Sequence, residues 1–201
     1  MIKRLSFGIR GGHVAAGLRT PADVRPLRVV AGPTLPAVTE DDLGYDGIAI
    51  EWFRDDAHLA RFQECASEPA TGVVVVVADE VVVRGADWLE QRWREGGVRY
   101  KHLAVARRAE GLSAAEFSAR WLGHAGRLSS TVVIPDDVRG CAYVQNHVRG
   151  EGVYHAVNEV WFDDAPSLWR RAGYFRDAVP PSDLVSWSAY LATREYVLRG
   201  G

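Results

Sequence analysis

Short apolar segments alternate with glycine-, proline- and aspartate-rich turns along the whole chain. In the second half this pattern predicts strands at 101–108, 140–148, 154–162 and 186–198. The last of these strands is expected to be broken near Thr193. Ser113 and Glu116 form a capping box at the start of one helix, and an aspartate cap before Pro166 opens another. The resulting order, β-α-β-β-α-β, is that of a ferredoxin-like unit.

The first half predicts the same order less clearly. Its apolar segments indicate strands at 2–10, 27–31, 45–53 and 72–83. Its helical periodicity indicates a helix at 56–66. The segment expected to hold its first helix, 11–23, is short and is interrupted by glycines and a proline. We therefore divide the chain into a degenerate repeat at 1–85, a helical linker at 86–98 and a second repeat at 99–201.

Three segments of the first half return in the second half in the same order. Residues 45–57 match 154–165, residues 75–85 match 190–200, and Lys3-Arg4-Leu5 matches Lys101-His102-Leu103. Matches in a constant order indicate an internal duplication. A single unit would leave one apolar face of its sheet bare. We therefore predict an α+β fold in which two tandem ferredoxin-like repeats pack sheet to sheet as an intramolecular α/β barrel.

Composition and charge narrow the possible partners. A net charge of -2 gives no reason to expect nucleic acid or an anionic membrane surface as partner. No apolar run approaches the roughly 20 residues that span a bilayer, and Cys65 and Cys141 form no metal or disulfide motif. These features predict a cytoplasmic protein that binds neither nucleic acid nor membranes. A homodimer is possible, although the barrel can close within one chain.

Several segments of the second half form a pattern seen in a known family. They are Tyr100-Lys101-His102-Leu103, Arg107-Arg108 with Gly111-Leu112-Ser113 and Glu116-Phe117, Trp121 with His124-Ala125, Tyr143-Val144-Gln145-Asn146-His147, and Asn158-Glu159-Val160-Trp161-Phe162-Asp163-Asp164. This half resembles the EthD family of the dimeric α/β-barrel superfamily, whereas the first half resembles it only around Glu51-Trp52-Phe53. The resemblance implies a ferredoxin-like barrel and usually no metal or organic cofactor. It also implies relatives that degrade small organic compounds or tailor aromatic polyketides.

Three functional hypotheses follow from the barrel and the resemblance. The first is a cofactor-independent enzyme of the cyclase, dehydratase, decarboxylase or oxygenase type, acting on an aromatic or polyketide-like substrate in a cavity between the two sheets. The alternative is a non-catalytic binding protein for an apolar small molecule, and the third is a haem-binding or haem-degrading protein. The chain has no GxGxxG, P-loop, GxSxG or HExxH motif, so dinucleotide, NTP, serine-hydrolase and zincin functions lack their usual sequence signals.

Two histidines are candidates for a general base that acts near neutral pH. His147 lies in a predicted strand on the same face as Tyr143, and Asn146 lies on the opposite face. We expect the more apolar row, which includes Asn146, to face the helices and His147 to face the cavity. His124 shares a helical face with Trp121, and its alternative role is a packed histidine at a helix end. Tyr143, Asn146 and Trp121 are candidates for binding the substrate.

Two charged residues are candidates for supporting the reaction. Glu159 stands where the first half has Ile50, and a buried carboxylate requires a partner. We expect that partner to be Arg107, Arg108 or a histidine, so Glu159 either orients a catalytic imidazole or forms a structural ion pair. Arg108 is a candidate for stabilising an oxyanion, with an exposed strand end as its alternative. His102 is expected to be exposed or structural.

Two tryptophans occupy matched positions of the repeat. Trp52 and Trp161 are candidates for contacting a substrate, but their repetition favours packing in the core. A metal site assembled from His124, His147 and Glu159 across separate elements is a minor alternative. We expect neither a metal nor another cofactor.

Overall fold

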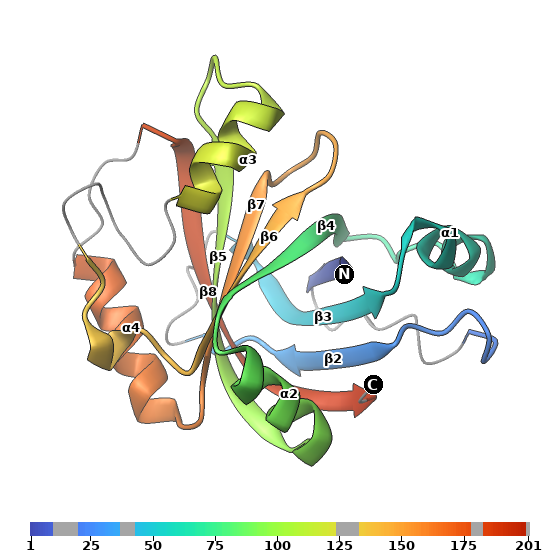
Figure 1. Ribbon diagram of the computed structural model, residues 1–201, viewed down its shortest axis with the longest axis horizontal. Helices are drawn as coiled ribbons and strands as arrows, with labels where there is room; N and C mark the ends of the chain where they lie inside the picture. The colour runs from blue at the N-terminus through green and yellow to red at the C-terminus, as the bar shows by residue number, and fades with distance from the viewer. Residues whose placement is uncertain (10–19, 37–42, 124–132, 178–182, 200–201) are drawn as a thin grey trace.

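A computed structural model describes residues 1–9, 20–36, 43–123, 133–177 and 183–199. Within these residues the protein is α+β, with eight antiparallel strands that close into a barrel and four α-helices (Figure 1). The segment 10–19, which covers most of the expected first helix of the first half, lies outside the described residues. No helix in the described part is long and apolar enough to cross a membrane.

The strands follow one another around the barrel in the order β1-β3-β2-β8-β5-β7-β6-β4. Their bounds are Ile2–Ile9 for β1, Arg28–Pro33 for β2, Tyr45–Phe53 for β3, Val73–Arg84 for β4, Val98–Arg108 for β5, Ala142–Val148 for β6, Ala156–Phe162 for β7 and Val185–Arg199 for β8. Each half of the chain contributes four neighbouring strands. The halves are hydrogen-bonded at both edges, through β2–β8 and β4–β6. The expected two sheets are thus joined into one continuous wall.

Two of the helices begin at the caps that the sequence predicts. The four α-helices are α1 (Asp56–Cys65), α2 (Ala86–Glu95), α3 (Ala114–Gly123) and α4 (Ala165–Asp177), with a short 3-10 turn, η2 (Asp136–Val138). The predicted capping box is present, because the Ser113 amide donates to Glu116 at 3.0 Å and the Glu116 amide donates to Ser113 Oγ at 3.2 Å. The Asp164 carboxylate caps α4 by accepting from the Ser167 amide at 2.7 Å.

The capping box gives a modest stability prediction. Replacing Ser113 by alanine removes the acceptor for the Glu116 amide, so Ser113→Ala should lower the free energy of unfolding by about 1 kcal/mol. Urea titration followed by circular dichroism would measure this change. Because the box is exposed, a loss of several kcal/mol would contradict a purely local capping role.

The barrel interior holds the largest cluster of buried apolar side chains among the described residues. Trp52 and Trp161 are fully buried within it, which confirms the core-packing interpretation of both residues. At one end Leu89 and Trp93 of α2 join this cluster. The expected linker helix is therefore also part of the core.

Strand β8 runs without a break from Val185 to Arg199, so the predicted interruption near Thr193 is wrong. Thr193 is buried and lies opposite Lys101 in the ladder. The next inward-facing residue, Glu195, forms an ion pair with Lys101. The polar residues from Thr193 to Glu195, which suggested a break in the strand, therefore lie within a continuous strand, where Thr193 and Glu195 are buried.

Candidate functional site

The barrel wall separates the predicted site residues into two groups. Asn146, Glu159, Trp52 and Trp161 lie in the interior, where all four have 0% exposure. Tyr143, His147 and Trp121 of α3 lie outside the wall, as their contacts below show. Arg108 is at the end of β5, where its guanidinium contacts Glu151 at 2.8 Å. His124 lies outside the described residues.

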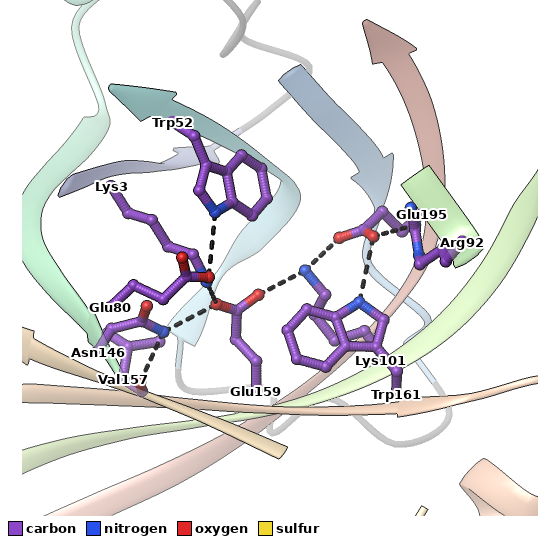
Figure 2. A network of polar contacts seen from close by, with 10 residues as sticks. All are labelled: Lys3, Trp52, Glu80, Arg92, Lys101, Asn146, Val157, Glu159, Trp161 and Glu195. Atoms are coloured by element: carbon purple, nitrogen blue, oxygen red, sulfur yellow. Dashed lines mark hydrogen bonds and ion pairs between the residues drawn. The ribbon is translucent and has the colours of Figure 1, made fainter. Parts of the chain in front are cut away.

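Glu159 is held between the only two lysines of the chain (Figure 2). Its Oε1 accepts from Lys3 Nζ at 2.5 Å and its Oε2 accepts from Lys101 Nζ at 2.6 Å. The prediction that its partner is Arg107, Arg108 or a histidine is therefore wrong. The lysines come from β1 and β5, at positions that the sequence match already pairs.

The contacts on either side of Glu159 resemble each other. On the first-half side, Lys3 contacts Glu80 at 2.9 Å and the Trp52 indole donates to the same carboxylate at 3.1 Å. On the second-half side, Lys101 forms an ion pair with Glu195, and the Trp161 indole donates to that carboxylate at 3.3 Å. Matched residues thus make matched contacts.

Two further residues complete this interior network. Arg92 of α2 forms an ion pair with Glu195. The Asn146 amide donates to Glu159 at 2.8 Å and to the Val157 carbonyl at 2.9 Å (Figure 2). The network therefore holds three cations and three carboxylates, so its charges balance.

Electrostatics hold the network in its charged form. Burial by itself would raise the pKa of Glu159, but Lys101 and Lys3 outweigh burial and hold that pKa at about 2. Burial would lower the pKa of Lys3, yet Glu159 and Glu80 raise it. Each charge is compensated by protein groups and shielded from solvent. This arrangement supports the structural ion-pair alternative for Glu159, and it brings no described histidine to that carboxylate.

His147 lies on the outer side of the barrel wall, contrary to the prediction that it faces the cavity. Its Nδ1 is 2.7 Å from Ser118 Oγ of α3, whereas Asn146 points inward to Glu159. The prediction failed because the interior of a closed barrel is the larger core, so the more apolar row of β6 turns inward. Burial lowers the pKa of His147, and Asp79 offsets this only in part.

The second-half strands carry a partly open outer face between two helices. We call this surface, formed by β8, β5, β7 and β6 and flanked by α3 and α4, the α3–α4 face (Figure 1). At its centre Ala104 lies between Tyr190 and Asn158 in the ladder, and all three are partly exposed. Solvent therefore reaches the middle of the sheet. A flat ligand could contact the small side chain of Ala104 there.

Polar and aromatic side chains gather around this opening. The Trp121 indole donates to Asn158 Oδ1 at 3.1 Å. The Gln145 amide donates to the Trp121 carbonyl at 2.9 Å and to the Tyr143 hydroxyl at 3.1 Å, while Gln145 Oε1 is buried without a partner. Burial raises the pKa of Tyr143, so its phenol stays protonated. The predicted binding residues Tyr143 and Trp121 are thus on one face, together with His147.

A histidine and an arginine beside Tyr143 escaped the sequence reasoning. His102 on β5 is 2% exposed and Arg171 on α4 is 7% exposed. Arg171 Nε donates to His102 Nδ1 at 3.3 Å, and its Nη1 donates to the Val138 carbonyl at 2.7 Å. Because Nδ1 accepts, the proton of the neutral imidazole is on Nε2, and this buried atom has no partner among the described residues.

Aromatic rings surround this pair. The imidazole of His102 stacks on Tyr190 with ring centroids 5.2 Å apart, and its centroid is 5.7 Å from that of Phe175. The guanidinium of Arg171 lies 4.3 Å from the Phe175 ring centroid. Burial and the neighbouring Arg171 hold the pKa of His102 well below its usual range, so the imidazole is neutral at physiological pH.

The sequence did contain a signal for this pair. The matched residues of the first half are Arg4 for His102 and Glu51 for Val160. Arg4 and Glu51 form a buried ion pair at 2.6 Å. The second half therefore replaces the carboxylate with valine and carries its arginine on the helix instead.

The described residues contain no group of three or more histidine, cysteine or acidic side chains that could hold a metal ion. The proposed ligands Glu159 and His147 are on opposite sides of the barrel wall. Comparison of the sequence with known protein families and with curated proteins finds no match.

Proposed function

We propose that the protein is a cofactor-independent enzyme acting on a small aromatic or polyketide-like molecule bound at the α3–α4 face. The observation that carries this proposal is the buried pair of His102 and Arg171, which presents an unpartnered imidazole N–H beside a guanidinium among aromatic rings. The position differs from the cavity between sheets expected from the sequence, because the barrel interior is filled by core side chains and the ion network.

We also propose that the barrel is a fusion of two ferredoxin-like repeats of the EthD type. The matched contacts of Lys3 with Glu80 and of Lys101 with Glu195 support this proposal. The strand orders β4-β1-β3-β2 and β8-β5-β7-β6 are those of two equivalent units. In this view the first half contributes only strands of the barrel, whereas the second half contributes both strands and the candidate site.

The chemistry of the face suits reactions through an enolate or phenolate. The Nε2–H of His102 would donate to a developing oxyanion, and the positive charge of Arg171 on the other side of the imidazole would stabilise the negative charge from a distance, because both groups are fixed and largely shielded from water. Tyr190 offers a ring for stacking against a planar substrate. An enolate formed by deprotonation could cyclise, eliminate water or react with O2, and loss of CO2 from a carboxylated substrate would give the same kind of enolate, which is then protonated.

His147 is the candidate base at the other end of the same face. It lies two strands across from His102 (about 10 Å) and four residues along the sheet (about 13 Å), so the two imidazoles are about 16 Å apart. This separation is too long for both imidazoles to act on the same carbonyl group, so His147 would act only on the distant end of an extended polycyclic substrate. Burial lowers the pKa of His147, which favours the neutral imidazole; because its Nδ1 contacts Ser118 Oγ and its Nε2 is buried, a substrate proton would reach it through Ser118.

The proposal can be tested with hydroxynaphthalene and anthrone compounds incubated with the purified protein. Mass spectrometry of the reaction mixture should show conversion without added cofactor. His102→Phe, which keeps an aromatic ring but removes both the Nε2–H and the Nδ1 acceptor of Arg171, should reduce the rate about 100-fold or more. Arg120→Ala is the matched control, because Arg120 is an exposed residue of α3 that pairs with Asp183.

The outcomes separate the three hypotheses. Full activity of folded His102→Phe would refute the proposed site. Tight binding of an unchanged ligand would favour the binding protein, and a Soret band after addition of haemin would favour the haem protein.

A further inference from the structure

Arg171 differs from the other buried cations of the described chain. Four other lysines and arginines are buried, and each contacts a carboxylate; they are Lys3, Arg4, Arg92 and Lys101. No carboxylate of the described residues lies within ion-pair distance of Arg171. Its hydrogen bonds go only to an imidazole nitrogen and a backbone carbonyl. A buried charge without a counter-charge is strongly disfavoured unless a ligand supplies one.

The surroundings of Arg171 add positive charge and no negative charge. The ionisable groups that act on it are Tyr143, Tyr190, Arg84 and Tyr174. Arg84 in turn donates to the carbonyls of Gly140 and Arg139, at 2.7 Å for Gly140. Burial lowers the pKa of Arg171 to about 10, which still leaves the side chain charged at neutral pH. The potential at this part of the α3–α4 face is therefore positive.

The pair has two donors that the described residues do not use. Arg171 uses Nε and Nη1 within the protein, and Nη2 has no hydrogen-bond partner among the described residues. His102 contributes the unpartnered Nε2–H. Because the Nδ1 side of the imidazole faces Arg171, the Nε2–H points away from the guanidinium, so the two donors would contact different atoms of a ligand. The positive charge of Arg171 matches an oxyanion, and the adjacent ring of Tyr190 matches a planar carbon skeleton.

We propose that Arg171, held in place by His102, forms a recognition site for the oxyanion of a planar aromatic ligand, either a carboxylate or an ionised phenol or enol. This inference rests on the proposed function and specifies its substrate class: the ligand binds as an anion. The negative charge of the ligand takes the place that Glu51 occupies beside Arg4 in the first half. Neutral analogues of the same shape lack this interaction.

Calorimetric titration with three probes tests the charge requirement. Naphthalene-1-carboxylate should bind at least tenfold more tightly than the neutral naphthalene-1-carboxamide. Preferential binding of 1-nitro-2-naphtholate, at a pH where it is ionised, would identify the phenolate as the preferred source of the oxyanion. Arg171→Met should abolish the preference for the anions, while Arg120→Ala should preserve it.

Restoring the first-half arrangement provides a second, independent test. Val160→Glu places a carboxylate at the position matching Glu51, next to His102 in the ladder. It should neutralise Arg171 and weaken binding of the naphthoate at least tenfold. The neutral, isosteric Val160→Gln should retain most of the affinity, and thermal unfolding would confirm that both variants are folded.

The results distinguish this inference from the proposed function. Equal affinity for the carboxylate and the carboxamide, or an anion preference that survives in Arg171→Met, would overturn the oxyanion site and leave an aromatic site intact. Failure of all three probes to bind would contradict both proposals.

Discussion

Replacement of Glu159 by glutamine should lower the free energy of unfolding by about 3–5 kcal/mol, because it leaves two buried lysines to share fewer carboxylates. The wild-type network balances three cations with three carboxylates, and Glu159 alone contacts both Lys3 and Lys101. Glutamine keeps the shape of the side chain and removes only the charge. The buried network of Glu159→Gln would carry one uncompensated positive charge at neutral pH.

Urea titration of the purified proteins would measure this loss. The matched control is Glu151→Gln, since Glu151 is exposed and pairs with Arg108 at the surface. Exposed ion pairs contribute roughly 0–1 kcal/mol, so the control should unfold almost as the wild type does. A loss below about 1 kcal/mol for Glu159→Gln would show that water or rearranged side chains compensate the lysines.

The same carboxylate predicts sensitivity to acid. The pKa of Glu159 is about 2 in the folded protein, compared with an ordinary value of 4.5. A lowered folded-state pKa means that the stabilisation is fully present above pH 4.5 and is lost as the pH falls toward 2. The free energy of unfolding should decline over this interval in the wild type. Glu159→Gln should lack this contribution, and an unchanged slope in the variant would assign the acid sensitivity to other carboxylates.

Local patterns were sufficient for many of the elements. The capping box of Ser113 and Glu116 and the aspartate cap of α4 are short-range signals, and the structure contains both. The repeated tryptophans, Trp52 and Trp161, identified the core because packing positions of the two halves coincide. These features depend on residues close in sequence or on a match between the halves.

The candidate site was less accessible to sequence reasoning because its geometry is non-local. Lys3 and Glu159 are separated by 156 positions, so no local pattern joins them. Which face of β6 turns toward the barrel interior depends on which side of the sheet holds the larger core. Assigning the larger core to the wrong side exchanged the predicted positions of His147 and Asn146. Arg171 occupies a polar position in the sequence pattern of its helix, and this pattern does not distinguish a buried arginine from an exposed one.

Two buried arginines should differ in how the same substitution changes stability, with a loss for one and no loss for the other. Arg92→Met removes a partner of Glu195 within the interior network and should lower the free energy of unfolding by about 3 kcal/mol. Arg171→Met removes a buried charge that no described carboxylate compensates. It also removes two hydrogen bonds, each contributing about 1 kcal/mol, to His102 and to the Val138 carbonyl.

For Arg171→Met the relief of the unpaired charge should outweigh the lost hydrogen bonds, because an uncompensated buried ion costs several kcal/mol. We expect the ligand-free variant to be as stable as the wild type or more stable by up to about 2 kcal/mol. Parallel urea titrations of wild type, Arg92→Met and Arg171→Met would show this contrast. Residues kept for binding often lower stability, so a gain in stability with a loss of anion binding identifies Arg171 as such a residue. A loss above about 1 kcal/mol for Arg171→Met would instead indicate that its charge is already compensated in the free protein.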